Sequence, residues 1–87
     1  MSPGAALEFP TDYPIKVVGK PDGEFRARVH ALVLRHAPDV TAERVRERPS
    51  SNGNFLSISY LVPAVSATQI EALVADLRAC EGVVMLL

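Results

Sequence analysis

Apolar and polar positions alternate most regularly over residues 55–62, and this pattern predicts a β-strand. Four large side chains share one face of that strand: Leu56, Ile58, Tyr60 and Val62. The opposite face carries two serines with an apolar residue at each end: Phe55, Ser57, Ser59 and Leu61. Asn52-Gly53 precedes the strand and predicts a tight hairpin turn, because both residue types tolerate a positive φ. We expect the first face to enter the core and the second to meet another molecule.

Three further segments predict strands. Residues 13–19 alternate between apolar and polar positions and form the first strand. Residues 41–48 are rich in charge and precede Pro49, which is typical of a strand at a sheet edge. Residues 83–87 are apolar on both faces and end the chain as the last strand.

Two helices are predicted from their caps and from apolar residues at helical spacing. Asp22 is a suitable N-cap for a first helix that ends at Arg35-His36, before Pro38. Ser66 and Gln69 match a capping box, in which the serine accepts the Gln69 amide and the glutamine reaches back to the Ser66 amide. The second helix therefore begins at residue 67, and Gly82 fits the left-handed position that ends it.

The order of these elements is strand, helix, strand, strand, helix, strand. Right-handed crossovers place both helices on one face of the sheet. The sequence thus predicts an α+β, ferredoxin-like βαββαβ domain over residues 13–87, with a four-stranded antiparallel sheet in the order 4-1-3-2. We expect residues 1–12 to form a flexible or draped N-terminal segment, which Leu7 and Phe9 could hold against the domain.

The helix-free face of this sheet is a candidate interface. Its predicted residues come from the first and third strands: Val18, Phe55, Ser57, Ser59 and Leu61. Exposed apolar patches commonly mark interaction surfaces, so this face or the edge of the last strand predicts a protein partner or a homodimer. The alternative is that the N-terminal segment covers the face. No acid or base pattern accompanies the serines, so they are small contact residues rather than nucleophiles.

Composition excludes several classes of function. The chain has 87 residues and a net charge of −1, which leaves no overall basic field for nucleic acid. Cys80 is the single cysteine, so an internal disulfide and a cysteine-pair metal site are excluded. His30 and His36 lie six positions apart and cannot share an ion on one helix. With no membrane-length apolar run and no signal-peptide pattern, we expect a soluble, cytoplasmic protein without metal or cofactor.

Several short segments in order resemble the YbeD-like family of small, uncharacterised bacterial proteins. The segments are Leu7-Glu8-Phe9-Pro10-Thr11, Tyr13-Pro14-Ile15-Lys16-Val17-Val18-Gly19, Arg35-His36-Ala37-Pro38, Pro49-Ser50-Ser51, Gly53-Asn54 and Ser57-Ile58-Ser59. The resemblance covers residues 7–87. It implies a ferredoxin-like domain similar to the regulatory ACT domains of amino-acid enzymes. It also implies an association with lipoate metabolism, and it assigns no catalytic residues.

ACT-type domains bind small effectors near the loop between the first strand and the first helix, and this likeness gives a second candidate site. The residues of that loop here are Gly19, Lys20, Asp22 and Gly23. Its glycines allow close approach of a ligand to the backbone, and amides at the helix start can hold a carboxylate or phosphate. We therefore expect a small anionic metabolite as a ligand. A plain connecting turn with an N-cap explains the same residues.

Two other functions share this topology. Acylphosphatases use a glycine-rich first loop with an arginine and an asparagine, which Gly19, Gly23, Arg26 and Asn54 echo at a different spacing. RNA-recognition motifs need stacking aromatics on the central strands, where only Phe55 is available. The interpretation that fits best is a small non-enzymatic regulatory or protein-interaction domain, with no nucleic-acid or membrane partner.

Overall fold

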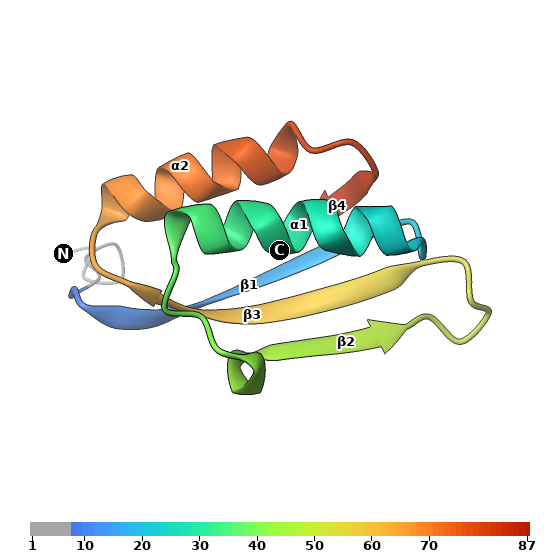
Figure 1. The fold of residues 1–87 in the computed structure, drawn as a ribbon, viewed down its shortest axis with the longest axis horizontal. Helices are drawn as coiled ribbons and strands as arrows, with labels where there is room; N and C mark the ends of the chain where they lie inside the picture. The colour runs from blue at the N-terminus through green and yellow to red at the C-terminus, as the bar shows by residue number, and fades with distance from the viewer. Residues whose placement is uncertain (1–7) are drawn as a thin grey trace, which may run out of the picture.

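Two helices lie side by side on one face of a four-stranded antiparallel sheet in the computed structural model, which describes residues 8–87 (Figure 1). The elements, in chain order, are β1 (Thr11–Gly19), α1 (Gly23–His36), the 3-10 turn η2 (Ala42–Arg44), β2 (Val45–Pro49), β3 (Leu56–Ala64), α2 (Ala67–Arg78) and β4 (Val83–Leu86). The strand order is β2-β3-β1-β4, so β1 and β3 are central. The predicted fold class and strand order are therefore confirmed.

The hydrophobic core lies between the sheet and the helices. Its fully buried side chains alternate along the central strands and recur at helical spacing on both helices: Val17, Phe25, Val29, Val33, Ile58, Val62, Leu73 and Leu77. The four apolar residues of β3 that were predicted to face inward are all buried. The same alternation sends the serines of β3 to the helix-free face.

The strand predicted over residues 41–48 is wrong at its beginning. Ala42–Arg44 forms a 3-10 turn instead, closed by a 2.9 Å hydrogen bond from the Arg44 amide to the Thr41 carbonyl. Alanine, glutamate and arginine are weak strand formers, so nothing local opposes the turn. The strand β2 begins at Val45, opposite Tyr60 of β3.

The hairpin turn before β3 also differs from the prediction. Gly53 has a positive φ of 78°, whereas no residue other than glycine within 8–87 does. Asn52 acts through its side chain instead, since its Oδ1 accepts hydrogen bonds from the Ser50 hydroxyl at 2.9 Å and from the Asn54 amide at 3.1 Å. The turn is consequently longer than a two-residue loop and closes between Ser50 and Phe55, whose carbonyl accepts the Ser50 amide.

The start of α2 contains the predicted capping residues with one difference. The Ser66 hydroxyl accepts the Gln69 amide at 3.1 Å, but Gln69 Oε1 accepts the amide of Val65 at 2.6 Å rather than that of Ser66. Gln69 Nε2 also donates to the His36 carbonyl at 2.8 Å. Nε2 of His36 lies 2.6 Å from a carboxylate oxygen of Asp76. These contacts join the end of α1 to α2.

The N-terminal segment is described only from residue 8. Leu7 lies outside the described residues, and Phe9 packs against the hydrophobic core. Thr11 and Asp12 are already part of β1, opposite Ala64 and Pro63 of β3. Within residues 8–87, no helix has the length and apolarity needed to cross a bilayer.

Candidate functional site

The helix-free side of the sheet, here called the open face, is organised in two adjacent rows that cross all four strands. In the first row, Ser57 of β3 lies between Arg48 of β2 and Val18 of β1, and Met85 follows on β4. In the second, Ser59 lies between Arg46 and Lys16. Leu87 extends this row, because its backbone exchanges hydrogen bonds of 2.8 and 2.9 Å with Lys16.

A shallow hollow of about 370 Å³ lies at the centre of the open face. Lys16, Arg46, Arg48, Ser57 and Ser59 line it, together with part of Glu47. The hollow exists because the two serine side chains are short while their cross-strand neighbours are long. We call the three cations around it, Lys16, Arg46 and Arg48, the cationic cluster.

The cationic cluster has no ion-pair partner within residues 8–87. Three other arginines are paired with carboxylates: Arg26 with Glu47, Arg28 with Glu24, and Arg44 with Asp12. Arg46 and Arg48 are two residues apart on β2 and so lie about 7 Å apart. Lys16 is two strands away from Arg46 and so lies about 10 Å from it. The centre of the open face is therefore locally positive although the chain as a whole is not.

Apolar side chains surround the cationic cluster. Phe55, directly before β3, and Leu61, within β3, are 41% and 39% exposed, and Met85 on β4 is 53% exposed. All five predicted interface residues lie on or at the end of this face, and Val18 is half-buried beside Ser57. The structure thus places apolar side chains at the ends of the face and charge at its centre, where the sequence interpretation expected an apolar patch.

Sequence reasoning missed the cationic cluster, although the signal was present. Arg46 and Arg48 are two positions apart and therefore lie on the same face of β2. The strand order places β2 beside the serines of β3. Combining these two observations places both arginines next to Ser57 and Ser59. Mixed charges along residues 43–48 instead suggested an ordinary solvated edge.

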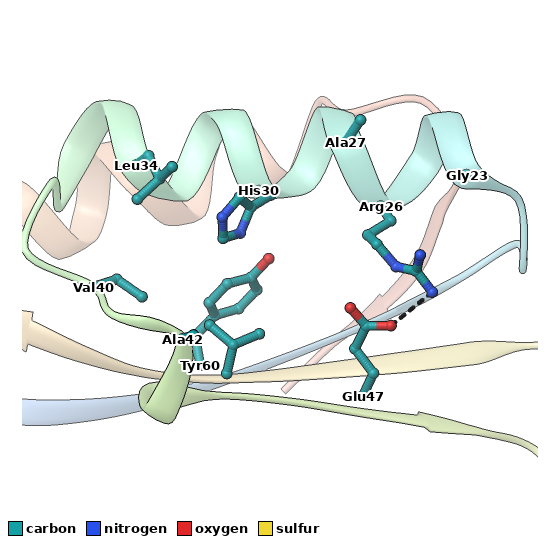
Figure 2. A pocket seen from close by; sticks show the side chains of 10 residues that line it. Gly23, Arg26, Ala27, His30, Leu34, Val40, Ala42, Glu47 and Tyr60 are labelled. Atoms are coloured by element: carbon teal, nitrogen blue, oxygen red, sulfur yellow. Dashed lines mark ion pairs between the residues drawn. The ribbon is translucent and has the colours of Figure 1, made fainter.

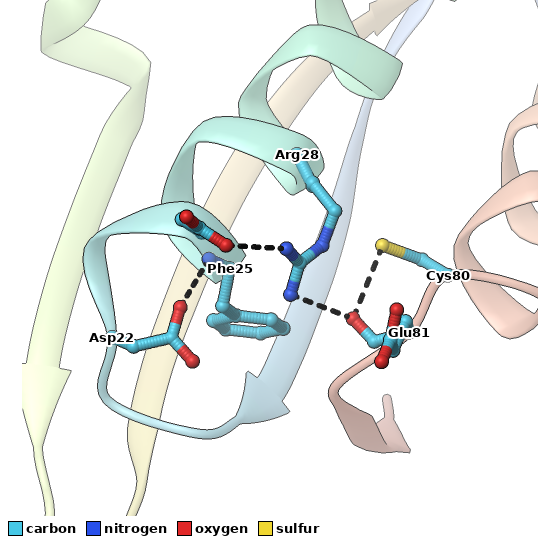
Figure 3. A network of polar contacts seen from close by, with 6 residues as sticks. Asp22, Phe25, Arg28, Cys80 and Glu81 are labelled. Carbon is cyan, nitrogen blue, oxygen red and sulfur yellow. Dashed lines mark hydrogen bonds and ion pairs between the residues drawn. The ribbon is translucent and has the colours of Figure 1, made fainter.

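At the predicted effector loop, the Asp22 side chain already caps the start of α1 (Figure 3). The Asp22 carboxylate accepts the Phe25 amide at 2.6 Å and so occupies the position that an anion would take at the start of α1. Arg28 donates to the Glu81 carbonyl at 3.3 Å and lies 3.6 Å from Glu24. The Arg28–Glu81 hydrogen bond ties α1 to the turn that precedes β4.

The two glycines of this loop differ in their surroundings. A Cβ atom on Gly19 would lie 2.3 Å from the Phe25 ring and 2.4 Å from the Gly82 carbonyl oxygen, so Gly19 allows close packing of these groups. Gly23 has no heavy atom within 4 Å of its Cβ position. Gly23 and Lys20 are exposed, whereas Gly19 is buried.

The residues that resemble those of an acylphosphatase do not come together to form a phosphate-binding site. Arg26 is paired with Glu47 at 2.7 Å, and Asn54 lies exposed in the turn before β3. The histidines are separated too, since His30 stacks against Tyr60 while His36 contacts Asp76. In the described part of the chain, no group of three or more metal-ligating side chains is present.

The family described as "Protein of unknown function (DUF493)" matches residues 5–87. The chain belongs to this family. A UPF0250 protein of Ectopseudomonas mendocina is 45% identical over 82 residues, which cover 93% of this chain and 89% of that protein. A UPF0250 protein of Nitrosomonas europaea is 36% identical over the full length of both chains. The resemblance to the YbeD-like family is confirmed by these relatives, whose names carry no activity.

Solved structures with this fold include two from other bacteria. The crystal structure of the ACT domain from GTP pyrophosphokinase of Chlorobium tepidum has a TM-score of 0.66 at 15% identity and covers 88% of this chain and 97% of that one. The C-terminal domain of the MgtC protein from Mycobacterium tuberculosis has a TM-score of 0.64 at 22% identity and covers 94% and 89%. At these identities the likeness establishes an ACT-like ferredoxin fold.

Proposed function

We propose that this chain is a small non-enzymatic regulatory or protein-interaction domain that binds an acidic protein segment on its open face. The observation that carries the proposal is the cationic cluster, in which three cations without carboxylate partners among residues 8–87 surround a hollow lined by serines. Unpaired cations are exposed to a partner's carboxylates without first having to break ion pairs of their own.

The apolar surroundings favour a protein over a small free anion. Phe55, Leu61 and Met85 offer exposed apolar area on either side of the charges. Protein interfaces are enriched in aromatic residues, methionine and arginine, and depend on apolar contact near such charges. In an extended acidic segment, carboxylates two residues apart are about 7 Å apart, which matches the spacing of Arg46 and Arg48.

Charge also argues against two copies meeting through the open face. A twofold axis through the hollow would bring the cationic cluster of one copy against that of the other. Like charges placed opposite one another destabilise such a contact. A homodimer through the edge of β4 avoids this repulsion and is a different outcome of the test below.

The more specific parts of the proposal rest on the sequence and on family context. The lone cysteine supports a cytoplasmic setting, and the family resemblance supports an association with lipoate metabolism.

A small anionic metabolite at Gly19, Lys20, Asp22 and Gly23 is a second proposal, supported by the exposure of Gly23 and Lys20 and opposed by the Asp22 cap. A thermal-shift panel of amino acids, lipoyl and acyl compounds tests this loop, and a flat response would contradict it.

Affinity capture with matched charge variants tests the open-face proposal. Immobilised wild type, R46E/R48E and R35E/R78E are compared in one bacterial extract, because Arg35 and Arg78 are exposed on the helices and the two double variants change net charge equally. We expect an acidic protein that is retained by wild type and by R35E/R78E, is lost with R46E/R48E, and binds again after purification. Equal retention on all three, or self-association alone, would contradict the proposal.

A further inference from the structure

A second hollow, of about 490 Å³, lies on the other side of the sheet between α1 and the edge strand β2. Its walls are mainly apolar and come from α1, the following loop, η2 and β2: Ala27, Leu34, Val40, Ala42 and Val45. Tyr60 forms the floor and His30 overhangs it (Figure 2). A largely apolar concavity with a few polar groups is the usual form of a small-molecule site.

The hydroxyl group of Tyr60 lies at this hollow and has no hydrogen-bond partner within residues 8–87. The side chain is 2% exposed. Figure 2 shows the hydroxyl pointing from the sheet toward α1, between His30 and Arg26. Buried hydroxyls in proteins are nearly always hydrogen-bonded, and an unmet one lowers stability. A ligand that supplied an acceptor would satisfy this group.

The neighbours of Tyr60 restrict the charge of such a ligand. His30 stacks on the ring with centroids 6.2 Å apart, and Arg26 and Glu47 pair at 2.7 Å beside the hydroxyl. Burial, and then the Glu47 carboxylate, raise the pKa of Tyr60 above its ordinary value, so the phenol stays protonated and can donate. Arg26 and Glu47 neutralise each other, so neither offers a free counter-charge to an ionic ligand, which would lose its hydration in the hollow.

We propose that the hollow binds a small, mostly apolar and uncharged molecule whose carbonyl or amide oxygen accepts the hydrogen bond of Tyr60. The apolar part lies against Leu34, Val40 and Val45, and the acceptor lies beneath His30. The site is separate from the open face, because Tyr60 points to the opposite side of β3 from Ser59 and Leu61. It therefore stands whether or not an acidic partner binds there.

Three probes of the same ring size separate the contributions to binding. Benzamide carries a neutral acceptor, benzoate carries an anionic one, and toluene carries none. Each is titrated into the full-length protein, with binding followed by two-dimensional NMR. We expect benzamide to shift the signals of residues that line the hollow, and to bind at least about fivefold more tightly than benzoate or toluene.

Two tyrosine variants assign the hydrogen bond. Y60F removes only the unpartnered oxygen and should leave the melting temperature unchanged or raised, so it tests binding in a folded protein. We expect Y60F to weaken benzamide binding about tenfold and Y13F, on the neighbouring strand, to leave it unchanged. Equal binding to wild type and Y60F, equal affinity for all three probes, or shifts outside the hollow would overturn the proposal.

Discussion

Lys16 and Arg46 stand in the same cross-strand row, separated only by Ser59. Both side chains are positively charged and lie on the open face, and neither has an ion-pair partner within residues 8–87. A protein selected for stability alone would gain by placing an acid at one of these positions. The acidic partner proposed above would supply carboxylates to these two side chains.

Reversing the charge at Arg46 should therefore stabilise the isolated chain. R46E puts a carboxylate in the row of Lys16 and next to Arg48, and we expect the free energy of unfolding to rise by about 0.5 kcal/mol. Urea denaturation at low salt measures it. R35E, in the last turn of α1, serves as the comparison and should lower stability, because it removes a cation from a helix C-terminus. A loss of stability in R46E would mean that Arg46 already has a stabilising contact.

Gly19 should tolerate no side chain. Its Cβ position lies 2.3 Å from the Phe25 ring and 2.4 Å from the Gly82 carbonyl oxygen, so G19A must displace the core or the backbone. We expect a loss of about 1–3 kcal/mol in urea denaturation. G23A, where nothing lies within 4 Å, should be as stable as wild type or slightly more stable. Equal stability of the two variants would show that the strand-to-helix loop is looser than described.

Gln69 should contribute more to stability than an ordinary surface residue of a first helical turn. Its side chain accepts from the Val65 amide at 2.6 Å and donates to the His36 carbonyl at 2.8 Å. We expect Q69A to lose about 1–2 kcal/mol, because both backbone groups lose their partner. T68A, at the exposed neighbouring position, controls for the loss of a side chain. A change in Q69A no larger than in T68A would contradict the link between the helices.

Tyr60 should make the fold sensitive to alkali. Its pKa is raised in the folded state, so above about pH 10 the unfolded chain ionises this phenol while the folded chain does not, and stability falls as pH rises. The chain has two tyrosines, so the Y13F variant isolates Tyr60. We expect tyrosinate absorbance in Y13F to appear only together with loss of helical circular dichroism. Ionisation near pH 10 in the folded protein would show that Tyr60 is solvated.

Alternation, caps and connection order were enough to predict the fold. The inward row of β3 and the Ser66–Gln69 start of α2 are local signals, and the right-handed crossover rule converts them into one topology. The strand predicted over residues 41–48 began too early, because the charged residues at its start hardly distinguish a strand from a tight turn.

Both candidate sites depend on neighbours that are distant in sequence. Ser59 could be read as a contact residue from β3 alone, but Lys16 and Arg46 join it only through strand pairing. Tyr60 was correctly predicted to face inward, yet its unpartnered hydroxyl follows from the positions of His30 and Arg26 on another element. Such features depend on tertiary packing, because a sequence pattern assigns a side chain to a face and not to a partner.

The cationic cluster is proposed to bind an acidic segment. Fluorescence anisotropy of a labelled peptide that alternates glutamate with apolar residues tests it, with a glutamine-for-glutamate peptide as the control. We predict saturable binding to wild type and to R35E/R78E, and binding at least about tenfold weaker for R46E/R48E or for the glutamine peptide. Equal affinity of R46E/R48E and wild type for the acidic peptide would contradict the account.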